Sequence, residues 1–183
     1  MPAFTTRMPP DDTHTRAVCD TCGWVAYDNP KIVVGAVVAH DGKVLLCRRA
    51  IQPRRGYWTI PAGYLEHGET VQEGARREAA EEAGADIAVD GTLAIYSISR
   101  IGQVQVIFRA GFANGPRFAA GIESLDVQLF SWEDIPWSEL AFPSVHWSLH
   151  AWRQAGTGPL GAPASNPPGD PRGTSPETPV VLP

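Results

Sequence analysis

The sequence predicts an α/β (α+β) fold in which helices sandwich a mixed β-sheet. Runs of β-branched and apolar residues, bounded by Gly, Asp or Pro, recur along roughly the first 130 residues, as is typical of strands. Among them lies one long stretch rich in Ala, Glu and Arg, which are residues that favour helices. At 183 residues the chain is long enough for one domain with a real core and with extensions.

Strands are expected on both sides of the helical stretch. Asp41-Gly42 lies between the first two apolar runs and is a hairpin signal. After the helix, Ile101-Gly102 lies between two further runs. The expected strands are Lys31–His40, Lys43–Arg48, Trp58–Ile60, Thr92–Ser99, Val104–Phe112 and Asp126–Ser131, and a short helix is expected at Trp147–Arg153.

The main helix is predicted from about Thr70 to Ala83. Thr70 or Glu69 can cap its N-terminus, where the helix dipole also favours a carboxylate. Gly84 follows the last expected helical residue and is a typical stop signal.

This helix crowds its acidic residues. At about 100° per residue, Glu78 and Glu82 lie within about 40° of each other, and Glu81 lies about 60° to the other side. The apolar Val71 and Ala75 lie on the same stripe, although a solvated helix would separate the two kinds of residue. The simpler explanation of the crowded glutamates is a run of charges on the protein surface. However, repulsion between three carboxylates on a partly buried face favours a cation bound between them. Mg²⁺ or Mn²⁺ suits carboxylate and carbonyl oxygens.

The polar residues of this stretch stand at one fixed spacing, G-x5-E-x7-R-E-U-x-E-E-x-G-U, where U is apolar. The segment resembles the Nudix box of the Nudix hydrolases, with every polar position filled. The two U positions are Ala79 and Ala85, where the family favours larger side chains. The residues that match are Gly63, Glu69, Arg77, Glu78, Glu81, Glu82 and Gly84.

The resemblance implies a Nudix fold and hydrolysis of a nucleoside diphosphate linked to another moiety. It implies that Glu78 and Glu82 are the chief metal ligands, completed by Glu81 and the carbonyl of Gly63. Glu78, Glu81 and Arg77 are therefore the catalytic candidates within the box, where Arg77 orients the carboxylates by fork-like pairing, with Glu69 as a candidate partner. Glu69 and Gly84 are expected to be structural. Glu123 is a candidate further ligand or general base from a later loop.

Outside the box, the chain is similar to a Nudix subgroup with an N-terminal zinc ribbon, over about Arg16 to Trp152. The matching stretches include Tyr27–Lys31 and Gln52-Pro53. The subgroup includes ADP-ribose pyrophosphatases and relatives that act on FAD. The resemblance thus implies FAD or ADP-ribose as substrate and AMP as a product. Sanitation of nucleoside triphosphates is the alternative, and a non-catalytic ligand-binding module is a third.

Cys19 and Cys22 form a C-x2-C-G knuckle that could supply two zinc ligands, whereas a structural zinc needs four. Relatives carry a second pair near their start, which this sequence does not show. Four explanations are open for the missing pair. The zinc site is lost, His14 and a water complete it, two chains share it, or the true start codon lies upstream. Of these, we expect a lost site, so Zn²⁺ is a minor expectation beside Mg²⁺ or Mn²⁺.

Charge and composition exclude some partners. The net charge of −5 without a basic stripe argues against nucleic acid, and the sequence contains neither a long apolar run nor a signal-like start. We expect a cytoplasmic protein that binds a small nucleotide and no membrane, with a homodimer left open. Arg48, Arg49 and Tyr64 are candidate substrate-binding residues.

We expect three regions: an N-terminal extension (1–30), the Nudix domain (31–153) and a Pro/Gly-rich tail (154–183). From Gln154 onward, 8 of 30 residues are Pro and 5 are Gly, so the tail is expected to be disordered.

Overall fold

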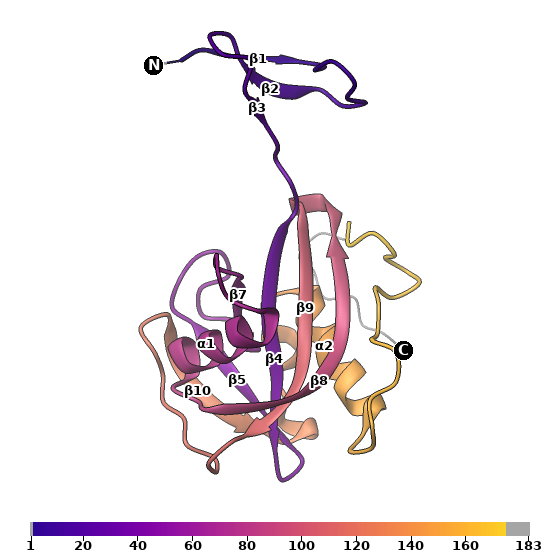
Figure 1. The fold of residues 1–183 in the computed structure, drawn as a ribbon. Coiled ribbons are helices and arrows are strands. Elements are labelled where there is room, and N and C mark those ends of the chain that lie inside the picture. Colours follow the sequence, from indigo (N-terminus) through magenta and orange to yellow (C-terminus); the bar gives the residue numbers. More distant parts are fainter. Residues whose placement is uncertain (1, 175–183) are drawn as a thin grey trace. The chain divides into compact units, whose positions relative to one another are not determined.

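The computed structural model describes residues 2–174 and divides into two compact units, with the boundary in the chain between Pro30 and Lys31. The smaller unit is a three-stranded antiparallel sheet, drawn in indigo in Figure 1. Its strands are β1 (Phe4–Arg7), β2 (Arg16–Cys19) and β3 (Val25–Ala26).

The larger unit is built on a seven-stranded mixed sheet of order β10-β5-β4-β9-β8, with β6 beside β5 and β7 beside β4. The central strands β4 and β9 run parallel, and the other pairs are antiparallel. The strands are β4 (Lys31–His40), β5 (Lys43–Arg49), β6 (Trp58–Thr59), β7 (Ala62–Tyr64), β8 (Ile87–Ile98), β9 (Gln103–Phe112) and β10 (Ser124–Phe130).

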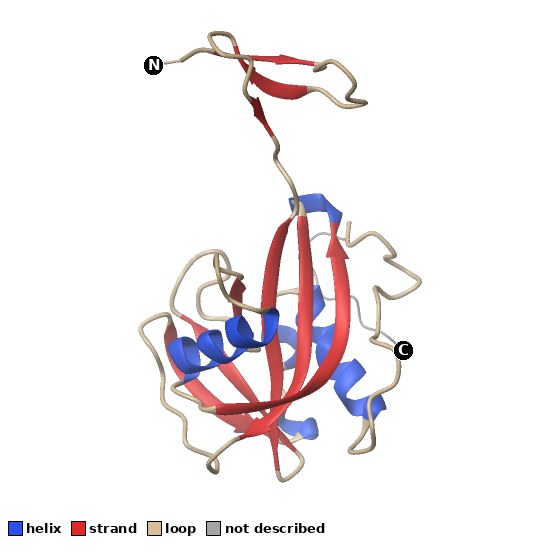
Figure 2. Ribbon diagram, in the orientation of Figure 1, coloured by secondary structure: helices blue, strands red, loops and turns tan. Residues whose placement is uncertain are grey.

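One helix packs on each face of this sheet, α1 (Val71–Ala83) in front and α2 (Pro143–Ala155) behind (Figure 2). The described part of this unit also contains three short 3₁₀ helices: η1 (Ser99–Ile101), η2 (Trp132–Asp134) and η3 (Trp137–Glu139). Within residues 2–174, no helix combines the length and the apolar character needed to cross a membrane.

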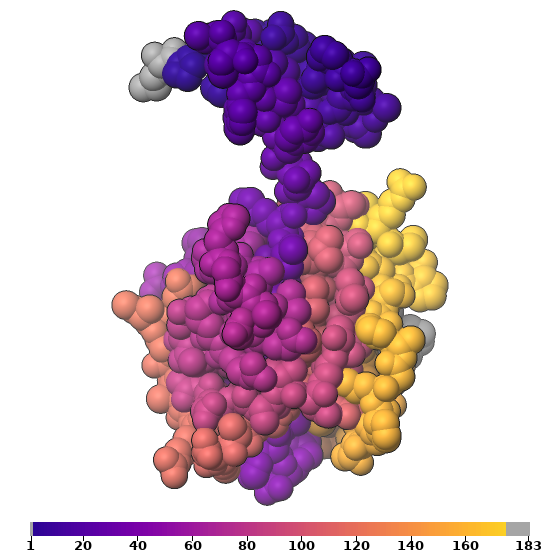
Figure 3. Space-filling model, viewed as in Figure 1, coloured from indigo at the N-terminus to yellow at the C-terminus, as the bar shows by residue number. Residues whose placement is uncertain are grey.

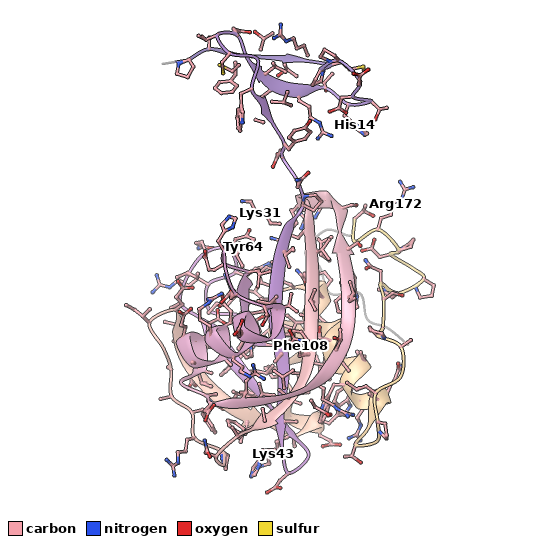
Figure 4. All side chains as sticks on the ribbon, viewed as in Figure 1. His14, Lys31, Lys43, Tyr64, Phe108 and Arg172 are labelled. Carbon is pink, nitrogen blue, oxygen red and sulfur yellow. The ribbon has the colours of Figure 1, made fainter. Side chains whose placement is uncertain are left out.

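Each face of the sheet has its own core. On the α1 side, the small side chains of Ala75, Ala79 and Ala83 pack against Val34 and Phe108, all with 1% exposure or less. Phe108 is labelled at the centre of the sheet in Figure 4. The alanines let α1 approach the sheet closely, which accounts for Ala79 where larger residues were expected.

The core on the α2 side contains the large aromatic residues. Trp147 packs edge-on against Tyr96, with ring centroids 5.4 Å apart, and Leu149 is fully buried beside them. Full burial of a side chain of this kind stabilises a fold by about 2–3 kcal/mol.

The predicted hairpin between β4 and β5 is present. Asp41 and Gly42 both have positive φ, 47° and 75°, as the tight hairpin turns that match strand twist require. Two predicted elements begin several residues earlier than expected. β8 begins at Ile87, because a register shift absorbs the break in alternation at Asp90-Gly91. α2 begins at Pro143, which occupies the first helical turn, where its missing N–H costs nothing.

The prediction of a disordered tail is wrong for residues 156–174. This segment lies along β8, as the yellow and pink atoms of Figure 3 show. Ile95 N–H donates to the carbonyl of Ala164 (2.8 Å), and Ala164 N–H donates to the carbonyl of Leu93 (2.9 Å). The carboxylate of Asp170, a residue with 4% exposure, accepts from the N–H of Thr174 (2.7 Å). Residues 154 and 155 of the predicted tail belong to α2, and residues 175–183 lie outside the described residues.

Candidate active site

The helix that carries the acidic cluster has defined caps. Thr70 accepts from the backbone N–H of Glu73, and the Glu73 side chain accepts from the N–H of Thr70, which is a complete capping box. At the other end, Gly84 adopts the left-handed conformation, with φ 57°. The predicted start at Thr70 and stop at Gly84 are therefore confirmed.

Arg77 holds the cluster together. Its Nε and Nη2 atoms donate to the two oxygens of Glu69, at 3.0 and 2.8 Å, which is the fork considered from the sequence. Its Nη1 atom donates to Glu78 (2.7 Å) and Glu81 (2.9 Å), and Nη2 also donates to the carbonyl of Tyr64 (2.9 Å). Hydrogen bonding from Arg77 lowers the pKa of Glu69 to about 2. One guanidinium thus organises three carboxylates and the loop before the helix.

Glu78 and Glu82 are buried carboxyl groups, with 8% and 6% exposure. Burial raises the pKa of Glu82 to about 7. The N–H of Ala62 donates to the Glu82 carboxylate (2.9 Å) and lowers this pKa, whereas the negative charge of Glu78 raises it further. Burial also raises the pKa of Glu78, against the effect of Arg77. Such burial is costly for anions, so a cation beside this pair would stabilise their charged forms.

Gly63 lies directly against the carboxylate of Glu78. A Cβ atom at this position would stand 2.3–2.4 Å from the carboxylate atoms of Glu78, so any larger residue here requires this carboxylate to move. Pairing of β7 with β4, which sets Gly63 opposite Val34, fixes the approach. The backbone of Gly63 and the carboxylate of Glu78 therefore face each other at contact distance.

Glu81 and Glu123 are exposed members of the same region. The Glu81 side chain is 60% exposed while it pairs with Arg77. Glu123 lies in the loop before β10, and its negative charge contributes to raising the pKa of both Glu78 and Glu82. The fold therefore brings Glu123, 41 residues beyond Glu82 in the sequence, into electrostatic range of the buried pair.

The two arginines that are candidate substrate-binding residues, Arg48 and Arg49, make different contacts. The positive charge of Arg49 acts on Glu82 and lowers its pKa, and its guanidinium lies 5.3 Å from the ring centre of Phe142. Arg48 instead donates to the carbonyl of Gly56 (2.9 Å). Arg49 thus acts electrostatically on the acidic site, while its Nε donates to the carbonyl of Pro53 (2.8 Å). The guanidinium of Arg48 also lies 6.0 Å from the ring centre of Trp58.

Tyr64 is half exposed (49%) and contacts Lys31 and Gln103. The Lys31 Nζ lies 5.3 Å from its ring centre, and the amide of Gln103 donates to its hydroxyl (3.1 Å). Figure 4 labels Lys31 and Tyr64 close together at one end of the larger unit. The ring is open to a stacking partner.

The oxygen atoms of this site are of the kind that binds a hard divalent cation. They come from the carboxylates of Glu78, Glu81 and Glu82 and from the carbonyl of Gly63. In residues 2–174, no three His, Cys, Asp or Glu side chains converge as a finished metal centre. Glu78 and Glu81 engage Arg77, and Glu82 engages Ala62. The structure therefore brings the buried pair and Gly63 together, and leaves Glu81 and Glu123 at the edge.

The predicted cysteine knuckle lies in the smaller unit. Cys19 is buried and Cys22 is exposed. The backbone N–H groups of Cys22 and Thr21 lower the pKa of the Cys19 thiol, which favours a thiolate. No third metal-binding side chain completes a cluster beside them in the part of the chain that the structure describes. These residues do not fit a four-ligand zinc site by themselves.

Backbone groups are the site members that sequence reasoning missed. The N–H of Ala62 binds Glu82, and the N–H of Glu66 binds Glu69 (2.8 Å). Any residue except proline offers an N–H, so no side-chain pattern marks these positions.

Sequence and geometry together define a class of protein, the hydrolases that act on acid anhydrides. The chain belongs to the Nudix family, since residues 29–152, about two thirds of its length, match the NUDIX domain. Residues 3–28 match the zinc-ribbon Nudix N-terminal domain. The family predicted from the sequence is thereby confirmed.

Known proteins agree with this assignment. A crystal structure of a NUDIX hydrolase from Nitrosomonas europaea is 40% identical to this chain, with a TM-score of 0.80 over 90% of this chain and 92% of that one. The predicted fold class is thus confirmed. A curated ADP-ribose pyrophosphatase from Methanocaldococcus jannaschii is 31% identical over 120 residues, 63% of this chain and 69% of that protein. A MutT-like protein from Streptomyces ambofaciens is 39% identical over 83 residues, 45% of this chain and about half (52%) of that protein.

Proposed function

We propose that this protein hydrolyses the pyrophosphate of a nucleoside diphosphate joined to another moiety, with FAD or ADP-ribose as the preferred substrate. The observation that carries the proposal is the buried pair Glu78 and Glu82, in which Glu78 lies against Gly63 and accepts from Arg77, and Glu82 accepts from the N–H of Ala62. Two largely buried carboxylates with raised pKa values are costly for a fold and cluster at functional sites.

The proposed cofactor is Mg²⁺ or Mn²⁺, held by Glu78, Glu82, Glu81 and the carbonyl of Gly63. When bound, the metal neutralises charge on the pyrophosphate oxygens and lowers the pKa of a water. Arg77 keeps Glu78 and Glu81 oriented, and the fork to Glu69 keeps Arg77 itself in place. Arg49, whose charge already acts on Glu82, offers a cation for the substrate phosphates.

The proposed reaction joins the oxygen of one water to one phosphorus and breaks one P–O bond of the anhydride. The products are AMP with FMN from FAD, or AMP with ribose 5-phosphate from ADP-ribose. Glu123 serves as the base that takes the proton of the water, or as a further ligand. Its side chain is exposed, and its charge already acts on both members of the buried pair.

Support for the substrate comes from the relatives and from Tyr64. The Methanocaldococcus jannaschii relative is named as an ADP-ribose pyrophosphatase, and the half-exposed ring of Tyr64 offers a surface for an adenine or flavin ring. The MutT-like relative supports the second candidate, pyrophosphatase action on nucleoside triphosphates.

A substrate panel tests the proposal. FAD, ADP-ribose, NADH, diadenosine polyphosphates, CoA and oxidised dGTP are compared at equal concentration with Mg²⁺, and released phosphomonoester is measured with a coupled phosphatase. We expect the highest kcat/KM for FAD or ADP-ribose. A triphosphate preferred by more than about tenfold, or about 1.4 kcal/mol in transition-state binding, overturns the substrate choice. Binding of these nucleotides without hydrolysis would instead identify a non-catalytic module.

A further inference from the structure

We propose that Gly121 is a positioning residue, which joins the loop that carries Glu123 to the last turn of α1 and so sets Glu123 relative to Glu78 and Glu82. The inference rests on the proposed function, because it concerns the placement of one of the proposed catalytic groups.

The loop before β10 caps the catalytic helix from outside. Gly121 N–H donates to the carbonyl of Glu82 (3.1 Å), and Ala119 N–H donates to the carbonyl of Ala83 (2.8 Å). The last helical carbonyls have no partner within a helix, and the last turn of α1 contains no basic residue. The N–H groups of Gly121 and Ala119 therefore bind carbonyl groups at the end of α1 that water or a lysine side chain would otherwise bind.

This contact tolerates no side chain. A Cβ atom at Gly121 would lie 1.7 Å from the carbonyl oxygen of Glu81. The backbone of Gly121 does not have positive φ, so its conformation is open to other residues and space alone requires glycine. Gly115, in the same loop, is the opposite case: it has φ +83° and no atom within 4 Å of a would-be Cβ.

The loop is fixed again directly after Gly121. Ser124 N–H donates to the carbonyl of Gly121 (3.1 Å), and Ala50 N–H donates to the carbonyl of Glu123 (2.8 Å). Ser124 then pairs with Arg49 at the start of β10. Glu123 thus sits on a short bridge between α1 and β5, with both of its ends hydrogen-bonded.

The geometry has a functional consequence. Glu82 provides a buried carboxylate through its side chain and an acceptor for Gly121 through its carbonyl. A shift of the loop away from this carbonyl therefore moves Glu123 away from the buried pair. Misplacement of a catalytic group by about 1 Å costs up to about 100-fold in rate.

The test compares Gly121→Ala, Glu123→Gln, the double variant and the control Gly115→Ala. The kcat, the Mg²⁺ concentration for half-maximal rate, and the melting temperature are measured for each. We expect Gly121→Ala to lower kcat by about 10- to 100-fold and Gly115→Ala to leave it within about twofold. In the Glu123→Gln background, Gly121→Ala should have little further effect, because the group that it displaces has already been removed.

Ala119→Pro serves as a second variant in case Gly121→Ala does not fold, because it removes the N–H that binds Ala83 and adds no side chain at position 121. Wild-type kcat in Gly121→Ala or in Glu123→Gln, or losses that simply add in the double variant, overturns the positioning role. A wild-type protein that hydrolyses nothing in the panel overturns the proposed function as well, and the two failures are thereby distinguished.

Discussion

Residues 63–85 and residues 156–174 both lie against the sheet of the larger unit, but different kinds of contact hold them there. In the first segment most hydrogen bonds join residues close in sequence, such as Thr70 with Glu73 and Arg77 with Glu81. In the second, Asn166 binds the backbone N–H and carbonyl of Ser97, 69 residues away. The Ser99 hydroxyl likewise donates to the carbonyl of Arg172, 73 residues away.

The difference teaches which parts of a sequence reveal their own structure. The first segment combines capping residues, helix formers and a fixed polar spacing, so its conformation follows from local rules. The second segment is rich in Pro and Gly and has few apolar residues, yet it pairs with the edge strand β8 through backbone groups. The low apolar content of this segment indicated disorder. Composition could not reveal the backbone pairing, because that pairing depends on a partner strand elsewhere in the chain.

Loss of a carboxylate from the first segment gives the largest expected effect. Glu82→Gln and Glu78→Gln should each reduce turnover by about 10²–10⁴ while the fold persists, because a proposed metal ligand is lost. Steady-state kinetics in Mg²⁺ and thermal melting measure the two properties separately. Near-wild-type turnover in either variant would show that the buried pair does not hold the metal.

Gly63→Ala tests the same segment without a change of charge. The new Cβ would stand 2.3–2.4 Å from the Glu78 carboxylate, so the carboxylate or the β7 backbone must move. We expect a loss in kcat of about 100-fold, accompanied by a weaker response to Mg²⁺. Gly158→Ala offers a matched control, because nothing lies within 4 Å of its would-be Cβ and its φ, like that of Gly63, is not positive. Equal kcat values for the two variants would count against the close approach.

The raised pKa of Glu82 predicts a pH effect on stability in metal-free protein. The pKa is about 7 in the folded state and 4.5 is its ordinary value, so the folded state binds the proton more tightly. This contribution to stability is fully present below about pH 4.5 and is lost as the pH rises through about 7. It amounts to about 3 kcal/mol in the free energy of unfolding.

The comparison with Glu82→Gln isolates this effect. Burial lowers the pKa of His146 to about 4, so His146 acts in the opposite direction over part of the same range. Denaturant unfolding of both proteins in EDTA, from about pH 5 to pH 8, should show the wild type losing stability relative to the variant. A constant difference between the two proteins would refute the burial effect on Glu82.

Changes to the second segment should affect stability and leave the chemistry intact. Truncation after Ala155 removes the backbone pairing with β8, and we expect a loss of about 2–3 kcal/mol and a melting temperature lower by several degrees. Asn166→Ala should cost about 1 kcal/mol, since it removes the two hydrogen bonds to Ser97. Turnover per folded molecule should remain close to wild type in both. An unchanged melting temperature after truncation would indicate that the pairing contributes nothing.

The sequence by itself determined the family, the helix that Thr70 and Gly84 cap, and the strands that follow hydrophobic patterning. The resemblance to the family also implied the fork between Arg77 and Glu69, which the structure contains. These features rest on preferences of the local backbone and on side chains near in sequence.

Only the tertiary structure decided the burial of Glu78 and Glu82, the approach of Gly63, the arrival of Glu123 beside them and the pairing of residues 156–174 with β8. Each of these depends on which strands are neighbours, and a sheet joins residues that are far apart in the chain. Backbone donors such as those of Ala62 and Gly121 carry no sequence signature, because nearly every residue offers the same N–H. Their role arises from the close approach of two chain segments, which the packing of the whole domain sets.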